Sequence, residues 1–186
     1  TKIMTLLVAV ENSTMDEKVT FTETGVRNVT ADSSNIGTKV GEVLTMEECL
    51  HALIIQSAND VAAQIAEHIG GTEQVFIDMM NQRASEIGCT NTHFANSSGL
   101  PDDNHYSSAR DMALIFREGL KNETFRTVVG TPDYIIQPTN MNSQQRILHT
   151  HHPMFAPESG FYYEGCIGGK TGTTVAAGHT LVTGVT

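Results

Sequence analysis

The sequence is short of cysteine, of basic residues and of long apolar runs, and each shortage excludes a class of protein. Its 186 residues include three cysteines, Cys49, Cys89 and Cys166. These are too few and too scattered for a disulfide framework or a zinc knuckle, so we expect small buried thiols. There are 11 Lys and Arg residues against 21 Asp and Glu, and the formal charge of −10 argues against binding nucleic acid phosphates.

The apolar residues set a second limit. No apolar run approaches the roughly 20 residues that a membrane-spanning helix needs, so we expect membrane contact only through segments outside this chain. The length suits one domain with a sizeable core or two small lobes. The chain opens on Thr1 without an initiator methionine, which leads us to expect further sequence upstream.

Helix signals dominate the first two thirds of the sequence. Residues 2–10 are apolar nearly all round, which suits a buried helix or a buried strand. The sequence Thr-Met-Glu-Glu at 45–48 is a capping box, and it predicts a helix that breaks at residues 56–59 and then resumes. Thr72 and Ser108 are predicted to cap two further helices.

Strand signals are weaker. Between residues 18 and 43 we expect short strands, including one over residues 26–29. Residues 127–136 are expected to form an extended segment or a strand pair, followed by a polar, histidine-rich connection to residue 164. A final strand is expected around Lys170.

The segment Gly-Gly-Lys-Thr-Gly-Thr-Thr at residues 168–174 places a cation and hydroxyls between glycines. Because glycine has no side chain, another molecule can approach such a backbone closely, and an extended substrate could add to the strand edge. Lys170 and Thr171 would then offer a charge and a hydroxyl. On this segment alone, a glycine-rich turn with a solvated lysine is an equal alternative.

Lys2, Ser57 and Asn59 could also carry chemistry. Ser57 and Asn59 lie in a tight connection from which both could point into one cleft, although either could simply cap the next helix. Lys2 is either a solvated terminus or a buried amine, whose pKa would be lowered by burial and by a second cation such as Lys170. A lowered pKa would let Lys2 act as a general base toward a hydroxyl nucleophile.

Together these elements resemble the motifs of the low-molecular-mass penicillin-binding proteins, the serine D-alanyl-D-alanine carboxypeptidases. Residues 1–5 are similar to the end of that family's Ser-x-Thr-Lys-x-Met-Thr, and Ser-Ala-Asn-Asp at 57–60 is similar to its Ser-Gly-Asn-Asp. Asn-Ser-Ser-Gly-Leu-Pro at 96–101 and Lys-Thr-Gly at 170–172 also match. The likeness covers essentially the whole chain.

The resemblance implies an α/β (α+β) fold of the β-lactamase/transpeptidase type, with a helical cluster packed on an antiparallel sheet. Residues 1–186 would form a single catalytic domain, which we expect to be incomplete at both ends. The family's nucleophilic serine would lie three residues before Lys2, and closing strands would follow Thr186.

The chemistry that the resemblance implies is acyl transfer without a cofactor or metal. A serine deprotonated by Lys2 would attack the peptide bond between two D-alanines, Ser57 would relay a proton to the leaving amine, and Asn59 would hold the substrate amide and Lys2. The partners would be peptidoglycan stem peptides, outside the cytoplasmic membrane. β-Lactams would acylate the same serine.

The strand around Lys170 would bind the substrate. Lys170 and Thr171 would engage its carboxylate, and Gly172 would leave room for its backbone. The backbone N–H of Thr173 would be one oxyanion-hole donor.

Two alternatives share parts of this pattern. A class A β-lactamase has the same three motifs but needs a glutamate between the second and third of them to activate water. The candidates Glu86, Glu118, Glu123 and Glu158 lack its Glu-x-x-Leu-Asn setting. A non-catalytic peptidoglycan-binding relative would lack the serine.

A metal site is the third alternative. Its ligands would be His149, His151 and His152, joined by His105 or His179. These histidines form no helical i,i+4 pair and have no acidic neighbours in sequence. A solvated polar loop fits them better.

Overall fold

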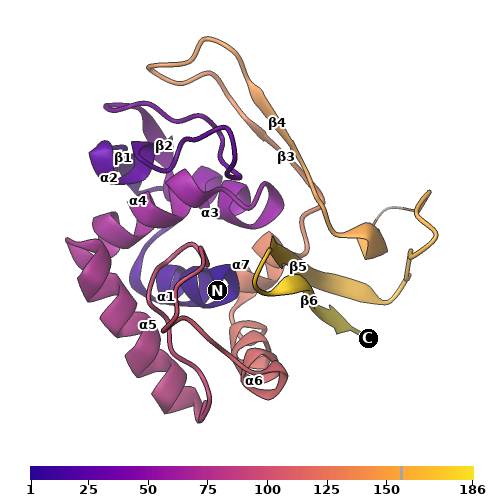
Figure 1. Cartoon of the computed structure of the whole chain (residues 1–186). Helices are drawn as coiled ribbons and strands as arrows, with labels where there is room; N and C mark the ends of the chain where they lie inside the picture. Colours follow the sequence, from indigo (N-terminus) through magenta and orange to yellow (C-terminus); the bar gives the residue numbers. More distant parts are fainter. Residues whose placement is uncertain (156) are drawn as a thin grey trace.

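The computed structural model describes residues 1–155 and 157–186, and it consists of a cluster of helices with three antiparallel strand pairs (Figure 1). The helices are α1 (Lys2–Asn12), α2 (Glu23–Val26), α3 (Met46–Ile55), α4 (Asn59–Gly70), α5 (Glu73–Ile87), α6 (Ala109–Gly119) and α7 (Glu123–Val129), with a 3-10 turn at Pro153–Phe155. The strands pair as β1 (Lys18–Thr20) with β2 (Val43–Thr45), β3 (Asp133–Ile136) with β4 (Arg146–His149), and β5 (Cys166–Thr174) with β6 (Gly178–Val185). The predicted fold class, helices with antiparallel strands, is confirmed.

Helix α1 lies at the centre of the helical cluster. Its first eight residues, Lys2 to Ala9, are all buried, and it packs against α3, α4, α5, α6 and α7. A helix that is apolar all round needs neighbours on every side. The structure therefore resolves the open choice for residues 2–10 in favour of a helix, and it makes Lys2 the first residue of a helix buried at the centre of the cluster.

The predicted helix starts are confirmed. Thr45 accepts a hydrogen bond from the N–H of Glu48, whose carboxylate accepts one from the N–H of Thr45, so the capping box is complete. Thr72 and Ser108 each accept a hydrogen bond from the N–H three residues further on. These signals are local, and for that reason they are legible in the sequence.

One strand prediction is wrong, and a second is correct only for residues 133–136, which form β3. The segment 26–29 contains the end of α2 and a turn in which the N–H of Val29 bonds to the carbonyl of Val26. Residues 127–129 belong to α7, which Asn122 caps. The β-branched residues of α7 favour strands on propensity, but the helix buries its apolar face in the core, and that burial outweighs the propensity.

The region between residues 136 and 166 also differs from expectation. The polar connection contains β4, which pairs with β3 so that Tyr134 lies opposite Leu148. Only four residues long, β4 offers too short a pattern to predict. Among the cysteines, Cys49 is buried, but Cys89 and Cys166 are half-buried, so the expectation of three buried thiols is wrong for two of them.

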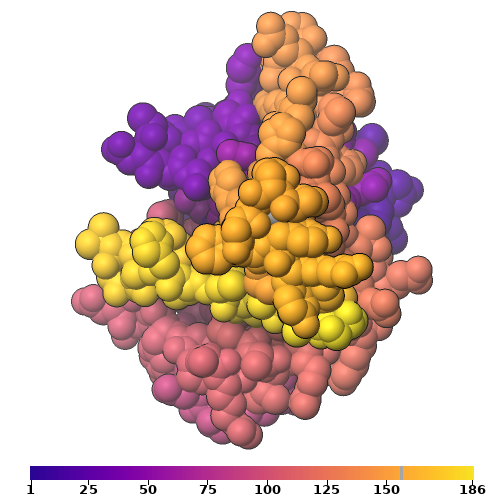
Figure 2. Space-filling model, turned by 90° about the vertical axis from the view of Figure 1, so that its right-hand side faces the viewer, coloured from indigo at the N-terminus to yellow at the C-terminus, as the bar shows by residue number. Residues whose placement is uncertain are grey.

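The β5–β6 hairpin forms one face of the molecule. Figure 2 shows it in yellow as a band across the surface, with the α6 region below and residues around 150–165 in orange above. Lys170 pairs with Val182 and Thr173 with His179. α7 contacts β5 and α6 contacts β6, which joins the hairpin to the helical cluster.

Candidate active site

Lys2 is the centre of the candidate site. Its side chain is 8% exposed, and Nζ donates hydrogen bonds of 2.7 Å to Oδ1 of Asn59 and 2.6 Å to the carbonyl of Ser98. The three residues come from the start of α1, the start of α4 and the loop between α5 and α6. The amine is therefore held by acceptors from three parts of the chain, and the solvated-terminus alternative is excluded.

The surroundings favour the neutral form of this amine. Burial and, to a lesser extent, the Lys170 ammonium together lower the pKa of Lys2 from its ordinary 10.5 to about 7, while the Asp60 carboxylate acts in the opposite direction. A primary amine with a pKa near neutral pH can accept a proton under physiological conditions. The structure thus brings Lys2, Asn59 and Lys170 together.

The turn before α4 is conformationally unusual. Ser57 has φ of 59°, in the left-handed region that residues other than glycine rarely adopt. The helix is capped by Ala58 and not through a side-chain hydrogen bond, so the alternative in which Ser57 or Asn59 is a side-chain cap is wrong. Strain of this kind persists where surrounding structure enforces it and gathers at functional sites.

The two polar residues of this turn, Ser57 and Asn59, differ in burial and in hydrogen bonding. Asn59 is 7% exposed, and its backbone N–H is held by the carbonyl of Ser34. Ser57 is half-buried, and its hydroxyl makes no hydrogen bond within residues 1–155 and 157–186. Ser57, which has the strained backbone, therefore also has a hydroxyl without a hydrogen-bond partner in the described residues.

Lys170 belongs to β5. Its Nζ donates a 2.7 Å hydrogen bond to the carbonyl of Thr171, and burial lowers its pKa from 10.5 to about 8. Among the described residues β5 pairs with β6 alone, which leaves the second edge of β5 unpaired. This is the arrangement predicted for a strand edge that can receive an extended ligand.

The rest of the Lys170 strand is less tightly held. Thr171 and Gly172 are half-buried, and Thr173 is exposed, with Oγ1 3.0 Å from Nδ1 of His179. A Cβ on Gly172 would meet only Oγ1 of Thr180, at 2.7 Å. Within the described residues, none of these three forms a side-chain hydrogen bond with Lys2 or Asn59. Their link to the site is that they belong to the same strand as Lys170.

Sequence reasoning missed two supports of the site. The carbonyl of Ser98 carries no side-chain signal, although its loop matched a motif. Asp60 is fully buried, and its carboxylate accepts hydrogen bonds from the N–H groups of Ile36, Thr38 and Val61 and from the Thr38 hydroxyl. Burial raises the pKa of Asp60 above its ordinary value.

A clamp at the start of α1 holds the loop that carries Ser98. Nδ1 of His105 accepts the N–H of Ala95, so Nε2 carries the proton and donates to Oγ1 of Thr1 at 2.6 Å. Burial lowers the pKa of His105, which favours this neutral form. Gly99 has φ of 86°, and a Cβ there would lie 2.9 Å from Oγ1 of Thr1. The loop can approach α1 because residue 99 is glycine.

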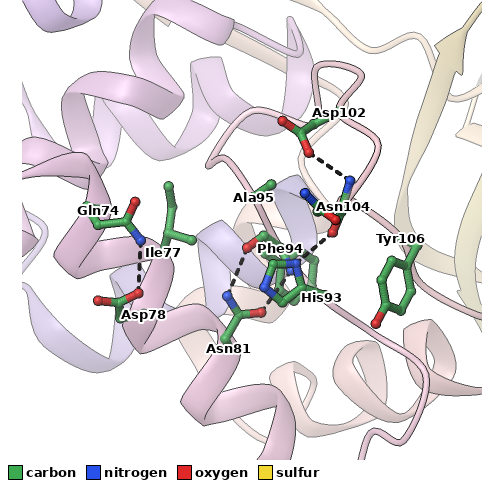
Figure 3. A pocket seen from close by; sticks show the side chains of 10 residues that line it. All are labelled: Gln74, Ile77, Asp78, Asn81, His93, Phe94, Ala95, Asp102, Asn104 and Tyr106. Carbon is green, nitrogen blue, oxygen red and sulfur yellow. Dashed lines mark hydrogen bonds between the residues drawn. The ribbon is translucent and has the colours of Figure 1, made fainter.

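A surface cavity of about 520 Å³ lies elsewhere, between α5 and the 93–106 loop (Figure 3). Four of its polar side chains already have partners, since Gln74 donates to Asp78, Asn81 exchanges two hydrogen bonds with the backbone of Phe94, and Nδ1 of His93 lies 2.6 Å from the carbonyl of Asn104. None of the lysines of the candidate site lines it. The candidate active site and this cavity are therefore separate places on the molecule.

The histidines considered as metal ligands have different partners. His149 pairs with Asp133, His105 with Thr1, His179 with Thr173 and His152 with Thr183. Within the described ranges, no group of three or more His, Cys, Asp or Glu side chains could hold a metal ion. In the same ranges no helix is both long and apolar enough to cross a membrane.

The fold is that of a class of proteins, the DD-peptidases of the penicillin-binding type. The model of the D-alanyl-D-alanine carboxypeptidase family matches residues 1–186, so the chain belongs to that family.

Two curated relatives show the extent of the match. The chain is 35% identical to the D-alanyl-D-alanine carboxypeptidase DacF of Bacillus subtilis, over 97% of this chain and 45% of the relative. It is 32% identical to DacB2 of Mycobacterium tuberculosis, over 97% of this chain and 59% of the relative. The chain thus spans about half the length of the curated relatives it matches.

Solved structures agree with this assignment. The Streptomyces K15 DD-transpeptidase superposes with a TM-score of 0.89 at 31% identity, covering 100% of this chain and 73% of that one. The D-alanyl-D-alanine carboxypeptidase of Mycobacterium tuberculosis gives a TM-score of 0.85 at 29% identity, with coverage of 100% and 67%.

Proposed function

We propose that the protein containing this chain is a serine-type D-Ala-D-Ala carboxypeptidase that works through an acyl-enzyme. The observation that carries the proposal is the buried Lys2 amine, with a pKa of about 7 and two fixed acceptors. Such an amine is suited to take the proton of a hydroxyl nucleophile. The serine that it would activate is the one expected three residues before Lys2.

The proposed reaction has two halves. Lys2 accepts the serine proton as the serine oxygen bonds to the carbonyl carbon between the two D-alanines. Ser57 relays a proton to the nitrogen of the terminal D-alanine, the C–N bond breaks, and D-alanine leaves. Water then attacks the ester and releases the shortened peptide and the serine hydroxyl. The uncommitted hydroxyl of Ser57 supports its assignment as the relay, and the hydrogen bond from Lys2 supports a positioning role for Asn59.

Substrate binding is assigned to β5. The substrate adds to the free strand edge, its terminal carboxylate binds the Lys170 ammonium and the Thr171 hydroxyl, and Gly172 leaves space for its backbone. The N–H of Thr173 donates to the developing oxyanion, and the removal of one such donor costs on the order of 10²–10³ in rate in a well-studied protease. The half-buried cation beside an unpaired edge supports these roles.

The natural substrates would be peptidoglycan stem peptides on the outer side of the cytoplasmic membrane, and β-lactams would acylate the same serine. This follows from membership of the family, whose substrate lies in the cell wall. No cofactor or metal enters the scheme.

The direct test is D-alanine release from a peptide ending in Lys-D-Ala-D-Ala, using the full-length protein. We expect release by the wild type and a loss of about 10²–10⁴-fold in Lys2→Met, the range that general-base catalysis supplies. Lys18→Met, at an exposed lysine, is the matched control and should leave the rate unchanged. Absence of release from the wild type, or full activity in Lys2→Met, would overturn the proposal.

A transpeptidase is the second candidate, because the Streptomyces K15 relative carries both names, carboxypeptidase and DD-transpeptidase. The two activities share the acyl-enzyme and differ in whether water or an amine accepts the acyl group. Adding a peptide with an N-terminal glycine as an amine acceptor to the same assay distinguishes the two activities. A transpeptidase transfers the acyl group to this amine, whereas a carboxypeptidase transfers it to water. A β-lactamase would instead turn over penicillin rapidly.

A further inference from the structure

His152 is a buried titratable residue that the proposed reaction does not use. It is 3% exposed and lies beside Gly169 of β5, just before the 3-10 turn that contacts this strand. Its ring lies 5.3 Å from that of Phe155. A buried imidazole needs partners for both ring nitrogens.

The partners of His152 fix its tautomer. The N–H of Met154 points at Nδ1 at 3.3 Å, so Nδ1 is the acceptor and the proton sits on Nε2. Nε2 then donates to Oγ1 of Thr183 at 3.2 Å, and the Thr183 hydroxyl donates to the carbonyl of Gly168 at 3.1 Å. One directional chain of hydrogen bonds therefore runs from the 3-10 turn through β6 to β5.

This series of hydrogen bonds ends at Gly168, where the backbone of β5 is constrained. Gly168 has φ of 140° beside a register irregularity, and a Cβ there would lie 2.5 Å from the carbonyl oxygen of Val129 in α7. A Cβ on Gly169 would lie 2.7 Å from Nε2 of His152 and 2.3 Å from the carbonyl oxygen of Val182. The backbone is thus enclosed by α7, β6 and the imidazole immediately before Lys170.

We propose that His152 and Thr183 are positioning residues for the substrate-binding strand. His152 orients the Thr183 hydroxyl, and the hydroxyl holds the Gly168 carbonyl. The irregular backbone at residues 166–168, here called the bulge, is thereby fixed and places the Lys170 amine beside Lys2. The inference rests on the proposed function, because Lys170 is taken there as the group that binds the substrate carboxylate. Neither residue touches the substrate.

The consequence for catalysis is a split between kinetic constants. Loss of the hydroxyl at residue 183 removes the hydrogen bond to the Gly168 carbonyl and lets Lys170 adopt other positions. Binding of the substrate carboxylate then weakens, while the serine and Lys2 stay in place. At a pH above the Lys2 pKa, where that amine is neutral in both proteins, we expect Thr183→Val to raise KM about tenfold, the equivalent of one hydrogen bond, with kcat within about threefold. Thr183→Ser keeps the hydroxyl and should restore KM.

The order of the hydrogen bonds, from His152 through Thr183 to Gly168, gives a second expectation. If His152 acts through Thr183, the double variant His152→Phe with Thr183→Val should be no worse than either single variant. Thr186→Val is the matched control, because it removes a similar bond to the carbonyl of Gly165 at the far end of the hairpin. It should leave KM unchanged. Thermal unfolding of every variant checks that the fold is retained.

A measurement independent of activity completes the test. In the full-length protein labelled with ¹⁵N-lysine, NMR titration should give Lys170 a pKa of about 8, and in Thr183→Val this pKa should rise toward 10.5 as the side chain gains solvent. Unchanged titration and unchanged KM in a folded Thr183→Val, or additive effects in the double variant, would overturn the inference. If the wild type releases no D-alanine, the proposed function fails, and the titration still decides whether Thr183 positions Lys170. Should Thr183→Val fail to fold, His152→Gln and His152→Phe take its place in both measurements, with Gln retaining a donor and Phe removing it.

Discussion

Nζ of Lys2 and Oδ1 of Asn59 lie 2.7 Å apart, although 57 positions separate the two residues in the sequence. The bond joins the first residue of α1 to the first residue of α4. Because both helix starts are buried, the pair is held by packing of the whole helical cluster. The amide oxygen accepts from Lys2 without adding a charge, which leaves burial free to lower the lysine pKa.

The first prediction follows from that neutrality. Asn59→Asp would place a carboxylate next to Nζ and raise the pKa of Lys2 from about 7 by roughly 1–3 units. Since only the neutral amine can act as base, the rising limb of acylation against pH should move to higher pH by a similar amount. The rate of acylation by penicillin between pH 5 and 10 measures this. Gln144→Glu, at an exposed amide, should not shift the limb.

The second prediction concerns the second cation. Lys170 lowers the pKa of Lys2, so Lys170→Met should raise that pKa and move the limb to higher pH. Lys170→Arg retains the charge and should leave the limb near its original position. The same acylation assay distinguishes them. Equal profiles for Lys170→Met and the wild type would show that the two amines do not interact.

The third prediction uses two glycines with similar backbones. Gly99 has φ of 86° and Gly41 has φ of 84°, but only a Cβ at residue 99 would meet another side chain, that of Thr1. Both Gly→Ala variants should lose about 1–2 kcal/mol of unfolding free energy from the left-handed backbone. Gly99→Ala alone should slow acylation, because it displaces the loop that presents the Ser98 carbonyl to Lys2. Urea unfolding and the acylation rate together test this, and an equal acylation rate in both variants would contradict it.

The fourth prediction concerns a buried ion pair outside the site. Arg146 contacts both carboxylate oxygens of Glu42, at 2.8 and 3.1 Å, and Glu42 is fully buried. Arg146→Met would leave this carboxylate without its cation and should cost about 3–5 kcal/mol. Arg126→Met, at an exposed position, should stay within about 0.5 kcal/mol of the wild type.

The pH dependence of this pair has a definite sign. Burial alone would raise the pKa of Glu42, but Arg146 and Thr139 outweigh it and bring the pKa below the ordinary 4.5. A lowered acid pKa contributes stability above pH 4.5 that is lost as the pH falls through the folded-state value. Urea unfolding at pH 7 and at pH 3 should therefore show a smaller effect of Arg146→Met at the lower pH. An effect that does not diminish would contradict this assignment.

The sequence predicts this structure where its signals are local. The caps at Thr45, Thr72 and Ser108 each depend on residues within one helical turn, and all three are correct. α7 was missed because a seven-residue helix rich in β-branched residues is decided by tertiary packing.

The candidate site likewise contains some features that the sequence predicts and others that depend on the folded chain. Lys2, Ser57, Asn59 and Lys170 were predicted as site residues from their side-chain types and positions and then from a family resemblance, and both depend on side-chain identities. The Ser98 carbonyl was not found, because every residue has a backbone carbonyl and its role depends on where the loop lies. The bonds from His152 and Arg146 likewise join segments that only the folded chain brings together.

The most direct test of the central claim is the mass of the full-length protein after incubation with a penicillin, followed by peptide mapping of the adduct. We expect one covalent adduct on the serine three residues before Lys2, formed with a pH dependence that follows the Lys2 amine. No adduct, or an adduct that maps to Ser57 or any other residue of this chain, would contradict it.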